Sequence, residues 1–179
     1  AMAANTTGGG NVAVGGYALD SNTTAAYNTA VGHAALTVNT TGQYNVAVGA
    51  YALDLQTTTS NNTAVGYNAM TATVGADNVA VGYSTLANNT TGGEQTAVGS
   101  DALKDNTTGT ENTAFGFSAL TNNLTGNSNT ALGRKALFTN TTGTGNIAVG
   151  QGALLANTTA SNNTAVGYDA LVANTTGTL

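Results

Sequence analysis

The chain has 179 residues, of which only 6% are charged, and its formal net charge is −5. Its three basic residues exclude the clustered Lys and Arg that nucleic-acid binding requires, and the absence of cysteine excludes disulfides and thiol chemistry. No apolar run approaches the roughly 20 residues of a membrane-spanning helix. A chain this poor in large apolar residues can build only a thin core of small side chains.

The chain begins with part of a repeat unit in residues 1–10, where Ala1-Met2-Ala3 reads as a cloning remnant. From residue 11 onward, the motif Asn-Thr-Ala-Val-Gly or a close variant returns ten times. It starts at Asn11, Asn28, Asn45, Asn62, Asn78, Gln95, Asn112, Asn129, Asn146 and Asn163. The spacing is 17 residues, except for 16 after the fourth start. A fixed short period is typical of a solenoid, so we expect one solenoid repeat domain over 11–179.

Each unit follows the template N-[TV]-A-V-G-x-x-A-L-x-x-N-T-T-G-x-x, whose positions are numbered 1 to 17 below. Thr and Val favour extended backbone, whereas Gly at position 5 suits a tight corner or a positive φ. The Ala-Leu to Asn-Thr-Thr stretch predicts a second short segment, and no helical period is present. The sequence therefore predicts an all-β fold, a flat parallel β-roll of about ten coils. At about 4.8 Å per coil the rod is roughly 50 Å long.

The strand faces follow from the alternation of side chains. Positions 2 and 4 share one face, which we expect to be buried inside the coil because position 4 is large and apolar. Position 3 is always Ala, which predicts close approach of another chain on the opposite face. The predicted interface residues are Ala30, Ala47, Ala64, Ala80, Ala97, Ala114, Ala131 and Ala148. A homotrimer is expected because a lone rod buries little apolar surface, with a monomer as the alternative.

Asparagine recurs at positions 1 and 12 and would stack from coil to coil. Stacked Asn side chains can form hydrogen bonds along the rod. They can also bond to the backbone of their own turn, and the two arrangements are compatible. Either way we expect these residues to be structural.

The motif Asn-Thr-Ala-Val-Gly followed by Ala-Leu and Asn-Thr-Thr-Gly, as in residues 28–42, resembles the repeat arrays of bacteriophage tail-fibre and related surface-fibre proteins. This resemblance covers nearly all of residues 5–179. The Thr-Ala-Val-Gly step is also similar to the Ser-Val-Ala-Ile-Gly step in the heads of trimeric autotransporter adhesins, whose unit is shorter. The resemblance implies a left-handed roll, a homotrimer and a segment of a longer extracellular fibre, on a virion or cell surface. Its partner would be a surface glycan or another host receptor.

The residues that carry chemistry are few. The single histidine, His33, cannot form a metal cluster with cysteine or other histidines, and we expect it to be an exposed loop residue. Asp77, Glu94 and Glu111 end three successive coils, so they would stack as solvated turn residues or, alternatively, as a cation ladder. The tyrosines at variable corner positions predict corner packing or stacking on sugars. No catalytic constellation and no cofactor motif are recognised.

Three functions follow from these features. The first is a non-enzymatic structural fibre segment that gives a rigid shaft or head for attachment to a host receptor. The second is ice binding, because flat solenoids with regular Thr columns can order water. One such column contains Thr29, Thr63, Thr96, Thr113, Thr130 and Thr164, although the Asn-Thr-Thr columns are more regular. A glycan-cleaving enzyme is disfavoured, since it needs paired carboxylates at set distances.

Overall fold

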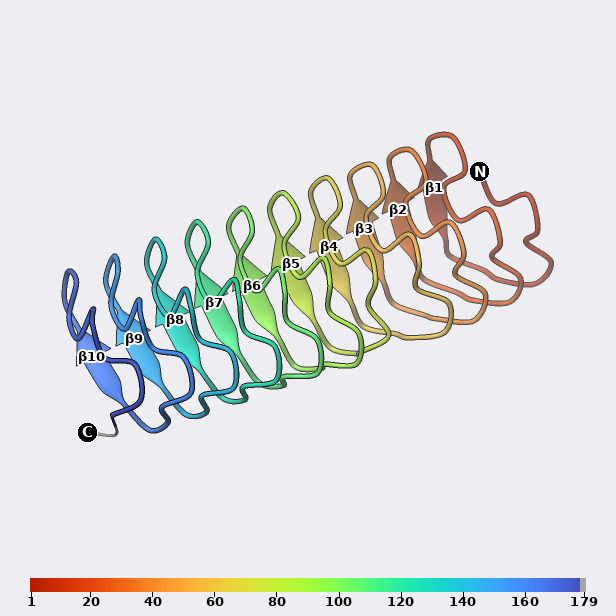
Figure 1. Ribbon diagram of the computed structural model, residues 1–179. Helices are drawn as coiled ribbons and strands as arrows, with labels where there is room; N and C mark the ends of the chain where they lie inside the picture. The colour runs from red at the N-terminus through yellow and green to blue at the C-terminus, as the bar shows by residue number, and fades with distance from the viewer. Residues whose placement is uncertain (178–179) are drawn as a thin grey trace.

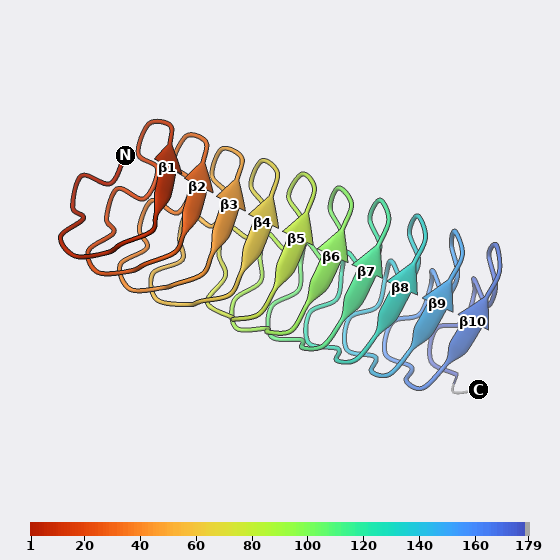
Figure 2. The same ribbon diagram turned by 180° about the vertical axis from the view of Figure 1, so that it is seen from behind.

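The computed structural model describes residues 1–177 and shows an elongated rod with the two ends of the chain at opposite ends (Figures 1 and 2). Ten short strands lie side by side in chain order in one parallel sheet. They are β1 (Val12–Val14), β2 (Thr29–Val31), β3 (Val46–Val48), β4 (Thr63–Val65), β5 (Val79–Val81), β6 (Thr96–Val98), β7 (Thr113–Phe115), β8 (Thr130–Leu132), β9 (Ile147–Val149) and β10 (Thr164–Val166). The predicted all-β parallel solenoid is confirmed. Within residues 1–177 no helix is long and apolar enough to cross a membrane.

The register places equal template positions above one another. Ala97 in β6 pairs with Ala80 on one side and Ala114 on the other. The coil that is one residue shorter keeps this register, because Ala64 still pairs with Ala80. The missing residue is therefore absorbed in the turns and not in the sheet.

The faces of the strands are the reverse of the prediction. The Ala side chains at position 3 point into the coil, where they form one core cluster with Ala at position 8 and Leu at position 9. Eight of them are 0% exposed in the single chain: Ala30, Ala47, Ala64, Ala80, Ala97, Ala114, Ala131 and Ala148. A side chain with no exposed surface cannot contact a second chain, so the predicted Ala interface is wrong. The coil is narrow and has room for only a methyl group at position 3.

The second predicted segment forms turns, so each coil contributes only one strand to the sheet. At its centre, the Leu column at position 9 adopts a left-handed backbone, with φ between 50° and 53° in every coil, including Met70. Such a conformation costs about 1–3 kcal/mol for a residue with a side chain. Complete burial of a Leu side chain contributes about 1.5–3 kcal/mol. Burial thus offsets the backbone cost, and the turn directs the largest buried side chain of the coil into the core.

The corner after each strand needs glycine, as predicted. The glycines at position 5 have φ between 128° and 140°. A Cβ atom on Gly32 would lie 2.5 Å from the carbonyl oxygen of Gly49 in the next coil. Both the backbone conformation and the close approach of successive coils therefore exclude other residues here.

The two Asn columns form the predicted hydrogen-bonded ladders inside the coil. At position 1, the backbone N–H of Asn129 donates to Oδ1 of Asn112 at 2.9 Å, and its Nδ2 donates to the Gly143 carbonyl at 2.8 Å. At position 12, Nδ2 of Asn123 donates to Asn106 Oδ1 at 2.8 Å. A strand of three residues leaves neighbouring buried backbone groups without hydrogen-bond partners in the sheet. The Asn side-chain amides provide hydrogen-bond partners for these backbone groups. Both the ladder and the local turn bonds are present.

The first residues of the chain stack on the first complete coil. The N–H of Met2 donates to the Ala18 carbonyl at 2.9 Å, and Nδ2 of Asn22 donates to Asn5 Oδ1 at 2.9 Å. Met2 has a φ of 52°, which matches the Leu column, and it packs against the core. Residues 1–10 therefore include a partial coil, in which Met2 occupies position 9.

Candidate binding surfaces

The outer sheet face consists of the side chains at positions 2 and 4 of β1–β10, which point away from the coil interior. It carries no charged residue, since position 2 is Thr, Val or Ile and position 4 is Val, Phe or Leu. Phe115 is 56% exposed and Val166 70% exposed, and several others are also exposed. A flat, uncharged and largely apolar surface therefore runs along one side of the rod.

A ladder of aromatic rings, the aromatic ladder, runs along the corner that follows strands β1–β5. It consists of Tyr17, His33, Tyr51, Tyr67 and Tyr83, one ring from each coil. Ring centroids of neighbours are 5.4–5.9 Å apart; three pairs are edge-to-face, and Tyr67 stacks on Tyr83. Such contacts contribute about 0.5–1.5 kcal/mol per pair beyond the area they bury. His33 is exposed, as predicted, but it is also the second rung of this ladder.

The aromatic ladder was not predicted from the sequence because its members are divided between template positions 6 and 7. A search for aromatic residues within two adjacent positions of successive coils would have found it. The remaining aromatic contacts are isolated pairs. Tyr27 stacks on Tyr44 with ring centroids 5.5 Å apart. The guanidinium of Arg134 lies 5.9 Å from the Phe117 ring centroid, and Lys135 Nζ lies 5.2 Å from that of Phe138.

The three carboxylates Asp77, Glu94 and Glu111 occupy the same corner of successive coils and are all exposed. Asn61 Nδ2 donates to Asp77 Oδ1 at 3.0 Å, and Ser128 Oγ donates to Glu111 Oε2 at 3.3 Å. Nowhere in residues 1–177 do three or more His, Cys, Asp or Glu side chains gather in a way that could hold a metal ion. All three side chains have the exposure that solvated corner residues have.

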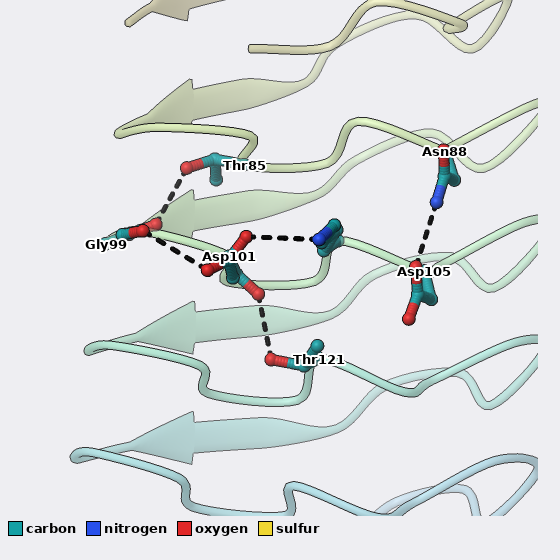
Figure 3. A network of polar contacts seen from close by, with 8 residues as sticks. Thr85, Asn88, Gly99, Asp101, Asp105 and Thr121 are labelled. Atoms are coloured by element: carbon teal, nitrogen blue, oxygen red, sulfur yellow. Dashed lines mark hydrogen bonds and ion pairs between the residues drawn. The ribbon is translucent and has the colours of Figure 1, made fainter. Parts of the chain in front are cut away.

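A polar network links the sixth coil to its neighbours (Figure 3). Thr85, which replaces Ala at position 8, donates its hydroxyl to the Gly99 carbonyl at 2.7 Å, so this buried hydroxyl is satisfied. Lys104 Nζ lies 3.4 Å from Asp101 Oδ1, and Thr121 Oγ1 donates to the Asp101 carbonyl at 2.8 Å. The only lysine near this region is thus engaged with Asp101.

A shallow groove, the amide groove, crosses four coils on the turn side of the rod and has a volume of about 440 Å³. Its lining residues come from positions 11 and 13, which flank the buried Asn column at position 12. They are Asn88, Asp105, Thr107, Asn122, Leu124 and Thr141. Position 11, which the template leaves open, is Asn, Asp and Asn in three successive coils here, and at position 13 Leu124 replaces the template Thr.

Asp54 is a half-buried carboxylate at position 10, and its Oδ1 has no hydrogen-bond partner among residues 1–177. Burial raises the pKa of Asp54 above the usual value of 3.8, against the opposing effect of the Asp54 and Leu55 backbone N–H groups. Because the folded chain holds the proton more tightly than the unfolded chain, ionisation of Asp54 destabilises the fold at neutral pH.

The variant Asp54→Asn is therefore expected to raise the melting temperature at pH 7, because it removes the ionised group. This advantage should shrink as the pH falls through the raised pKa, and it should vanish below the unfolded value of 3.8. Thermal melts followed by circular dichroism between pH 3 and 8 measure the difference. An advantage that is independent of pH would contradict the assignment to ionisation.

No protein-family model matches the chain, and neither the curated proteins nor the solved structures contain a significant match.

Proposed function

We propose that the chain is a non-enzymatic, rigid segment of an extracellular fibre, such as a phage tail fibre or a surface adhesin, that serves attachment to a host receptor. Its copies associate as a homotrimer through the outer sheet face. The observation that carries this proposal is the uncovered, uncharged face of ten parallel strands. Sheets made only of parallel strands are almost always covered on both faces. The left-handed sense of the coil stays a prediction of the resemblance.

The energetic reason for association is the thinness of the core. A typical coil buries two Ala side chains and one Leu as its apolar content, as in Ala97, Ala102 and Leu103. A Val, Ile, Leu or Phe that moves from water to a buried position contributes about 1.5–3 kcal/mol. The outer sheet face has such a residue at position 4 of every coil, so contact of this face with another chain would add stability along the whole rod.

The rod also suits a mechanical role. Successive coils are joined by backbone hydrogen bonds, for example Thr113 N–H to the Asn129 carbonyl at 2.8 Å, and by the Asn ladders. The chain therefore has no long flexible loop along its described length. Aromatic residues are enriched in binding surfaces, and the exposed aromatic ladder supports a role in attachment.

Charge on the outer sheet face should prevent association. The double variant Phe115→Lys/Leu132→Lys is expected to lower the mass in solution to that of one chain, since buried unpaired charges are costly. Thr108→Lys is the matched control, because Thr108 is exposed on the turn side of the rod. Light scattering coupled to gel filtration measures the mass, and circular dichroism checks that the fold is kept. Equal masses for both variants would refute the outer sheet face as the contact.

The alternative function, ice binding, is favoured by one specific observation. Thr at position 2 and Val at position 4 both point outward from a flat sheet, so Thr96 and Val98 are neighbours on the surface. This face was expected to lie inside the coil because position 4 is large and apolar, but Thr96 is exposed and Ala97 is the buried residue of the strand. Ice binding needs a free outer sheet face, whereas the fibre needs a covered one. Thermal hysteresis in dilute solution would favour ice binding, and its absence would end that alternative.

A further inference from the structure

We propose that the amide groove binds one pyranose ring of a neutral glycan. The inference deepens the attachment role of the proposed fibre and rests on it. In this groove the outward residues of neighbouring coils combine a carboxylate, two amides and an apolar side chain.

The polar groups of the groove are only partly used by the protein. Asn88 Nδ2 donates to Asp105 Oδ1 at 2.8 Å, which fixes the carboxylate (Figure 3). Asn122 Nδ2 donates to the Phe138 carbonyl at 2.9 Å, so its side-chain oxygen is left as an acceptor. The bond from Asn88 uses one oxygen of the Asp105 carboxylate, so the other oxygen can accept a hydrogen bond from a ligand. The groove therefore offers fixed acceptors from neighbouring coils.

The charge of the groove selects the ligand. Lys104 is paired with Asp101, so no basic side chain of the described chain neutralises Asp105. An anionic ligand such as a phosphate or a uronic acid would be repelled. A neutral ligand that donates several hydroxyl hydrogens matches the carboxylate and amide oxygens, because hydrogen bonds to an ionised acceptor are the stronger ones.

Leu124 supplies the apolar part of the site. It is 42% exposed and stands where the template has Thr. A pyranose has one face of C–H groups and a rim of hydroxyls, so the ring can pack on Leu124 while its rim reaches Asp105. Ligand sites commonly combine apolar walls with a few placed polar groups. Because the groove is shallow, we expect a dissociation constant of about 1–10 mM for one sugar. Several chains in one fibre would lower the apparent dissociation constant by avidity.

The test uses saturation-transfer NMR and titration with the methyl glycosides of glucose, galactose, mannose and N-acetylglucosamine. At least one should show saturable binding to the full chain. Asp105→Asn is expected to weaken it by about tenfold, since it removes a charged acceptor while keeping an acceptor for Asn88. Leu124→Thr restores the template residue and should weaken binding without harm to the fold. Asp20→Asn is the matched control, because Asp20 is also half-buried but lies in the first coil.

Two outcomes would overturn the inference: no saturable binding of any of the four glycosides, or equal binding by Asp105→Asn, Leu124→Thr and wild type. Light scattering on the same samples distinguishes a failure of the glycan-binding proposal from a failure of the fibre proposal. A lost sugar signal at a mass of about three chains would reject the groove alone, whereas a single-chain mass would reject the trimeric fibre whatever the sugars do.

Discussion

Replacement of Gly32 by alanine should lower the free energy of unfolding by about 3 kcal/mol or more. The φ of Gly32 is 139°, and the new Cβ would lie 2.5 Å from the Gly49 carbonyl oxygen, so backbone strain and a clash between coils add together. At about 2–4 °C per kcal/mol for a chain of this size, the melting temperature should fall by about 6–12 °C. Thermal and urea unfolding followed by circular dichroism measure both quantities.

The matched control is Gly16→Ala, one residue after the corner of the first coil. Its Cβ would meet only the His33 side chain, at 3.4 Å, and its φ is outside the left-handed region. This variant should melt close to wild type. Equal melting temperatures for the Gly32 and Gly16 variants would contradict the close approach of successive corners.

The variant Ala97→Leu should destabilise the single coil by about 3 kcal/mol, the upper end of the range for an overpacked core. Ala97 is fully buried between Ala80 and Ala114, in a coil with no room for three more carbon atoms. Val98→Leu is the matched control on the same strand, because position 4 points outward and Leu132 occupies it naturally. Urea unfolding at several protein concentrations separates loss of folding from loss of association.

The two accounts of the Ala column differ in the outcome of this variant. If position 3 is core, Ala97→Leu lowers the urea midpoint at every concentration. If position 3 were a contact between chains, the variant would dissociate into folded single chains with an unchanged midpoint. The second result would contradict the packing described above.

The features that could be predicted from the sequence are those that depend on the chemistry of a single residue type. Glycine at position 5 of each coil is required by a positive φ, and asparagine at positions 1 and 12 is required by buried backbone groups; both were correctly assigned. The fold class followed from the period. These features need no knowledge of the width of the coil.

The orientation of the strands depends on that width and was therefore missed. Alternation puts Thr96 and Val98 on one face and Ala97 on the other, but it does not say which face is inside. Hydrophobicity alone favours Val inside. The left-handed turn at Leu103 brings a large side chain into the interior opposite the strand, and the remaining space fits only Ala. That turn could not be predicted, because Leu is a rare residue at positive φ.

The candidate binding surfaces were only partly predictable for a related reason. Template positions that vary were treated as free, yet the structure aligns some of them across coils. His33 and Tyr51 occupy different positions of their units, but in the aromatic ladder their ring centroids are 5.4 Å apart. Likewise, Asp105 and Leu124 belong to different coils and different template positions, but they line the same groove.

The mass of the wild-type chain in solution tests the central claim most directly. Light scattering over a wide range of concentrations should give about three times the chain mass of 17.5 kDa if the outer sheet face is covered by other copies. A mass of 17.5 kDa at every concentration would contradict the account, because the outer sheet face would then stay exposed to water.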